Sequence, residues 1–89
     1  MRETYLEVMF HHGKPVAAYY YLTRRPGQKS YKSVPLEAGL VVDFGRGGKP
    51  IGIEITAPGL VSSAALNRVL RKFGQPLVKS ADLQPLRAA

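Results

Sequence analysis

The 89-residue sequence contains no cysteine, and this absence excludes several kinds of chemistry. Without thiols there are no disulfides, no thiolate nucleophile and none of the usual structural zinc sites, and a reducing compartment is favoured. No apolar run approaches the roughly 20 residues that cross a bilayer, and the N-terminal stretch MRETYLEVMF alternates instead of forming a signal-peptide block. The sequence therefore predicts a cytoplasmic protein that is neither secreted nor membrane-spanning.

Acidic residues are scarce: six, against thirteen lysines and arginines, which gives a net charge of +7. Such a balance favours an anionic partner, most commonly nucleic acid. Two acid-free clusters are the predicted nucleic-acid-binding residues: Arg24, Arg25, Lys29 and Lys32 in one, and Arg68, Arg71 and Lys72 in the other. Because the first cluster falls in a loop with Pro26 and Gly27, a solvated basic loop is the favoured interpretation there and nucleic-acid contact is the alternative.

Alternation of apolar and polar side chains predicts a small, mainly antiparallel sheet over about residues 3–57. The expected strands are 4–10, 16–23, a short edge strand at 31–35, 39–44 and 51–56. The turns HHGKP and GRGGKP would close two hairpins. In the last strand, three isoleucines alternate with Gly52, Glu54 and Thr56, which is the pattern of a half-buried strand.

One amphipathic helix is predicted over about residues 62–73, where Leu66, Val69, Leu70 and Phe73 form an apolar stripe. A serine at 62 or 63 can cap its start, and a glycine follows its end. Two prolines in the tail, 75–89, leave room only for a short turn at 81–84. We therefore expect one α+β domain, 1–89: a four- or five-stranded antiparallel meander with a C-terminal helix packed on one face.

Asp43, Gly48 and the run GIEI at 52–55, with weaker support from YYYL ending at Leu22, resemble a family of small bacterial proteins known only as domain of unknown function 2283. The resemblance covers roughly residues 5–60. It implies a small antiparallel sheet followed by a helix, and no established activity. Some members of that family resemble the antitoxin partners of small toxin genes.

The sequence contains no complete catalytic or metal-binding set. Asp43 and Glu54 could project from one outer face of a hairpin as an acid/base pair, but strand carboxylates more often keep a solvent face polar or fix a turn. Adjacent His11 and His12 are expected to point apart, and no cysteine or clustered carboxylate completes a ligand set. GRGGKP has Pro50 where a phosphate-binding loop needs Ser or Thr. We predict a structural role for the two carboxylates, no enzyme activity, no cofactor and no metal.

One helix cannot cover both faces of a sheet, so the opposite face needs another cover. The residues predicted to mediate self-association there are Tyr5, Met9, Tyr19, Tyr21 and Val41. The tail from Leu77 to Leu86, a second copy or another partner could cover them, and two outward tyrosines could also accept bases. We expect a non-enzymatic interaction module that forms a homodimer. The alternative is a nucleic-acid-binding or antitoxin-like regulator; a small protein partner is also compatible with the sequence.

Overall fold

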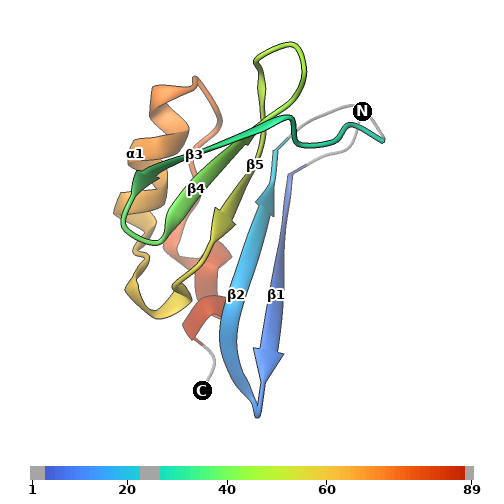
Figure 1. Ribbon diagram of the computed structural model, residues 1–89. Coiled ribbons are helices and arrows are strands. Elements are labelled where there is room, and N and C mark those ends of the chain that lie inside the picture. Colours follow the sequence, from blue (N-terminus) through green and yellow to red (C-terminus); the bar gives the residue numbers. More distant parts are fainter. Residues whose placement is uncertain (1–3, 23–26, 88–89) are drawn as a thin grey trace.

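The computed structural model describes residues 4–22 and 27–87. Five strands form one open sheet: β1 (Tyr5–His11), β2 (Lys14–Tyr21), β3 (Lys32–Glu37), β4 (Leu40–Phe44) and β5 (Pro50–Ile55). The 3-10 helix η1 (Pro58–Leu60), the α-helix α1 (Ser63–Lys72) and the 3-10 segment η2 (Ser80–Arg87) follow (Figure 1). The predicted α+β fold, an antiparallel sheet with a helix on one face, is confirmed.

The strand order is β1-β2-β5-β4-β3, and every neighbouring pair is antiparallel. Strands β3, β4 and β5 form a meander, but β2 pairs with β5 instead of β3, so the sheet differs from a simple meander at this link. Residues 22–31 make the connection. Within this connection, residues 23–26 lie outside the described residues.

The β1–β2 hairpin projects beyond the rest of the sheet (Figure 1). His12 and Gly13 both have positive φ angles, 53° and 77°, as in the type I′ turn that matches strand twist. Of β2, only Ala18–Tyr21 pairs with β5. Near the turn, Phe10 and Val16 are therefore each 50% exposed.

The inner face of the sheet is covered by α1 and by the tail that follows it. The helix starts where predicted, because Ser62 Oγ accepts the Ala65 N–H at 3.1 Å, and it ends before Gly74, whose φ is 65°. One core cluster joins side chains of β2, β4 and β5 to the helix and tail: Ala18, Tyr20, Leu22, Leu40, Val42, Ile53, Ile55, Val61, Leu66, Val69, Leu70, Val78, Leu83 and Leu86.

Asn67 fixes the tail to this inner side. Its Oδ1 accepts the Val78 N–H at 2.8 Å, and its Nδ2 donates to the Val78 carbonyl at 3.0 Å. The 3-10 segment that follows is longer than the predicted turn and contains Pro85, while Arg87 donates to the carbonyls of Pro58 and Val61. The tail thus packs beside α1, and within the described residues it does not cover the outer face.

Candidate functional site

Tyrosines and carboxylates form a connected network on the outer face of the sheet. The rings of Tyr5 and Tyr21 stack with centroids 4.3 Å apart, and Tyr19 meets Tyr21 edge to face at 4.6 Å. The Tyr21 hydroxyl donates to Glu7 Oε1 at 3.1 Å, and the Tyr19 hydroxyl donates to Asp43 Oδ2 at 2.8 Å. These contacts join β1, β2 and β4 into one outer surface.

Gly52 makes the hydrogen bond from Tyr19 to Asp43 possible. Strand β5 lies between β2 and β4, so the side chain of Tyr19 must cross β5 to reach Asp43. Gly52 is the residue of β5 paired with Asp43, and a Cβ at this position would overlap the phenol ring of Tyr19. The glycine is therefore needed for space, because a side chain there would fill the path of the tyrosine.

Asp43 is the buried anchor of the outer-face network. It is 4% exposed, and besides Tyr19 it receives a hydrogen bond from Ser33 Oγ at 2.6 Å. A buried carboxylate is costly unless it is hydrogen-bonded, and the two hydroxyl donors meet that need. A molecule outside the sheet cannot reach Asp43 without displacing one of these two side chains.

Glu54 lies on the same face of β5, opposite Tyr19 on one side and Val41 on the other. A hydrogen bond with Asp43, burial, and repulsion from the Asp43 charge together raise the pKa of Glu54 to about 7. Near neutral pH Glu54 is therefore protonated part of the time, and in that form its carboxyl can donate to Asp43. The structure places this pair on one outer face, as the hairpin pattern predicts.

We expect Glu54→Gln to remove a pH dependence of stability. Because the pKa of Glu54 is higher in the folded than in the unfolded protein, protonated Glu54 adds to the free energy of unfolding. This contribution is complete below the unfolded pKa of 4.5 and is lost as the pH rises through about 7. Because Glu54 is only half-buried, solvent screening reduces the expected loss to about 1–2 kcal/mol. Urea unfolding between pH 4.5 and 7.5 should show this loss in the wild type and not in the variant. Parallel curves would contradict the raised pKa of Glu54.

The predicted nucleic-acid-binding residues differ in their surroundings. Arg24 and Arg25 lie outside the described residues. Arg68 is engaged in an ion pair, since its guanidinium donates to both carboxylate oxygens of Glu37 at 2.9 and 3.0 Å. Hydrogen bonding to Arg68 holds the pKa of Glu37 below its usual value. The remaining predicted cations are exposed: Lys29, Lys32, Arg71 and Lys72.

The predicted self-association residues all lie on the outer face, but their exposure differs. Tyr5 is 45% and Met9 49% exposed, whereas Tyr19, Tyr21 and Val41 are half-buried because the tyrosine rings lie along the sheet. The sequence pattern does not predict the Tyr19–Asp43–Ser33 contacts. A glycine within an otherwise isoleucine-rich strand is the signal that could have indicated them.

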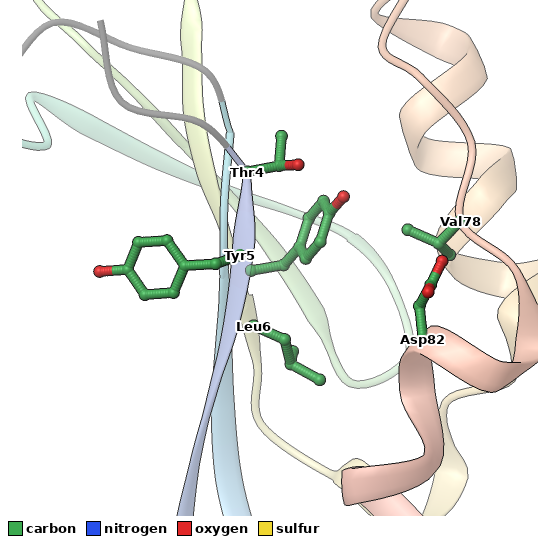
Figure 2. A pocket seen from close by; sticks show the side chains of 6 residues that line it. Thr4, Tyr5, Leu6, Val78 and Asp82 are labelled. Atoms are coloured by element: carbon green, nitrogen blue, oxygen red, sulfur yellow. The ribbon is translucent and has the colours of Figure 1, made fainter.

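A separate hollow of about 310 Å³ lies between the start of β1 and the tail. Figure 2 shows Thr4, Tyr5 and Leu6 on the strand and Val78 and Asp82 on the tail across from it. Asp82 accepts the Lys79 N–H at 2.9 Å, so this carboxylate caps the turn at the start of η2. This role accounts for Asp82 without a ligand.

Comparison with protein-family models, with curated proteins and with solved structures finds no match. Among the described residues, no helix is long and apolar enough to cross a membrane. The same residues contain no group of three or more histidine or acidic side chains that could hold a metal ion. A function is therefore inferred from the surfaces of this chain.

Proposed function

We propose that the chain is a non-enzymatic, cytoplasmic interaction module that associates with a second copy of itself through the outer face of the sheet. The observation that carries this proposal is the placement of α1 and the tail on the same inner side, which leaves the opposite face without cover from the described chain. Tyr5 and Met9 are about half exposed there. Burial of apolar area in a dimer would stabilise it by about 25 cal/mol per Å².

Charge favours a second copy over nucleic acid on this face. Glu7, Asp43 and Glu54 lie on it, and the described outward positions of β1, β2, β4 and β5 between them carry no lysine or arginine. An anionic polymer would meet the carboxylates of Glu7 and Glu54, whereas two copies meeting face to face keep their basic side chains apart. Repulsion between the copies is moderated because Glu7 and Asp43 accept tyrosine hydroxyls and the raised pKa of Glu54 reduces its charge.

The size of the face predicts a weak dimer. Strands about 4.8 Å apart with roughly five paired residues each outline a face of about 20 Å by 17 Å. Two such faces together cover about 680 Å², less than the roughly 1,000 Å² of a stable interface, so we expect a weak dimer with a dissociation constant in the upper micromolar range. A two-fold arrangement is the simplest closed assembly, since the same patch serves both copies.

Met9→Glu tests the proposal against a matched control. Met9 and Leu77 are both 49% exposed, so a glutamate at either position should leave the fold intact, but only Met9 lies on the outer face. We expect Met9→Glu to raise the dissociation constant at least about tenfold, which is about 1.4 kcal/mol, because a carboxylate would be desolvated in the interface. Leu77→Glu should leave the constant unchanged in sedimentation equilibrium. Equal effects of the two variants would contradict the proposed interface.

We also propose that the chain is related to the domain of unknown function 2283, since the residues on which that resemblance depends, Asp43, Gly52 and Glu54, act together in one network. A nucleic-acid-binding or antitoxin-like regulator is the second candidate function. The specific observation in its favour is a gathering of cations around Tyr31, at the end of the sheet where β3 begins.

A further inference from the structure

A basic and aromatic hollow lies where β3 and β5 begin and β4 ends. Tyr31 is 67% exposed, and the Arg46 guanidinium lies over its ring, 5.3 Å from the centroid. The hollow measures about 390 Å³. Its described lining consists of Tyr31, Lys32, Val34, Phe44, Arg46 and two glycines of the β4–β5 turn.

Backbone contacts hold the two sides of this hollow together. The Tyr31 N–H donates to the Phe44 carbonyl at 2.7 Å, which ties the segment before β3 to the end of β4. Gly45 closes the turn that carries Arg46, because its N–H donates to the Lys49 carbonyl at 2.9 Å. Gln28 packs against Gly45 so closely that a Cβ there would collide with its amide. The hollow is therefore formed before any ligand arrives.

Cations surround the hollow, and none of its described lining residues is acidic. Lys32 lines the hollow, and Lys29 and Lys49, which lie within two positions of lining residues in the sequence, are exposed. The rings of Phe44 and Phe73 meet at 5.5 Å, so the last turn of α1, with Arg71 and Lys72, lies at the same end of the molecule (Figure 1). Lys32 of one predicted cluster and Arg71 and Lys72 of the other thus lie at the same end of the molecule as the β4–β5 turn, whereas Arg68 is paired with Glu37.

We infer that this hollow binds one nucleotide of a single-stranded nucleic acid. The base would lie against Tyr31 above the apolar floor of Val34 and Phe44, and the phosphate would contact Arg46 and Lys32. Tyrosine faces and arginine planes both stack on bases, and lysine and arginine neutralise phosphates. A duplex keeps its bases stacked and paired, so only a single strand can offer one to the hollow. The inference deepens the second candidate function and does not depend on the dimer.

Fluorescence anisotropy with labelled 12-nucleotide single strands, oligo(dT) and oligo(rA), at 50–200 mM salt tests this site. Lys32→Gln with Arg46→Gln should reduce the slope of log affinity against log salt by about 1.4, since each single-strand phosphate contact contributes about 0.7. Tyr31→Ala should weaken binding roughly 5- to 150-fold at every salt concentration without changing the slope. Circular dichroism should show native folding for Tyr31→Ala, because this side chain is largely exposed.

Lys14→Gln with Lys79→Gln is the matched control, since it removes the same charge from exposed positions outside the hollow. We expect this control to retain wild-type affinity and slope, and the monomer-favouring Met9→Glu variant to do the same. The inference is overturned if the control weakens binding as much as the site variant, or if a duplex binds as tightly as a single strand. It is also overturned if adenosine monophosphate competes as well as an equal concentration of oligonucleotide, because the ligand would then be a free nucleotide.

Discussion

Replacing Gly52 with alanine is expected to destabilise the protein by about 2–4 kcal/mol, because the new methyl group would occupy the space of the Tyr19 phenol. The ring would have to leave the surface of β5, and the hydrogen bond from Tyr19 to Asp43 would be lost with it. A buried carboxylate that loses one of its donors adds the cost of an unsatisfied polar group. Urea unfolding at pH 7 measures the difference.

A double-mutant cycle identifies the cause of that loss. In a Tyr19→Ala background, Gly52→Ala should cost less than about 0.5 kcal/mol or stabilise the strand, since glycine is a poor strand residue. In a Tyr19→Phe background the steric part of the cost should persist, because the ring is still present, whereas the part due to the lost hydrogen bond is already absent. Strict additivity of Gly52→Ala and Tyr19→Ala would show that the ring does not lie over Gly52.

Asp43→Ala is expected to cost about 2–4 kcal/mol at pH 5, since it removes the shared acceptor of Tyr19 and Ser33 from a buried position. The cost should be smaller at pH 8. There the wild type carries the repulsion between Asp43 and an ionised Glu54, and the variant does not, because the Asp43 carboxyl is what raises the pKa of Glu54 to about 7.

Ser33→Ala is the comparison for this effect, because it removes one of the two donors and leaves the carboxylate in place. We expect it to cost about 1 kcal/mol. If Asp43→Ala cost no more than Ser33→Ala at pH 5, Asp43 would not be the anchor of the outer face. Both variants are measured by urea unfolding at the two pH values.

Local patterns predicted the secondary structure because each element has a regular period. Alternation in β5 and the helical stripe of α1 correspond to what the structure buries. The pairing of β2 with β5 was not predictable in this way, since the sequence pattern of a strand does not indicate which distant strand it pairs with. The packing of the tail on the inner side of the sheet was not predicted either, because the apolar residues of the tail follow no helical or strand period. It also depends on the side-chain amide of Asn67, a polar residue of α1, which hydrogen-bonds to the backbone of Val78.

The same distinction between local pattern and strand order applies to the candidate sites. Placing Asp43 and Glu54 on one face required only the register of a single hairpin, whereas the hydrogen bond from Tyr19 required the strand order. The pairing of Arg68 with Glu37 removes one predicted cation from the free surface. Arg46 adds a cation beside Tyr31 that the sequence clusters did not include, because the two residues meet only through the packing of separate segments.

Sedimentation equilibrium of the wild-type protein at about 10–100 μM and pH 7 tests the central claim, that the uncovered outer face is an interface between two copies. The micromolar affinity expected for a face of this size predicts an average mass that rises across this range toward twice that of the chain. The same experiment with Met9→Glu should give the mass of a single chain over most of the range. A wild-type protein that keeps the monomer mass up to 100 μM would contradict the account.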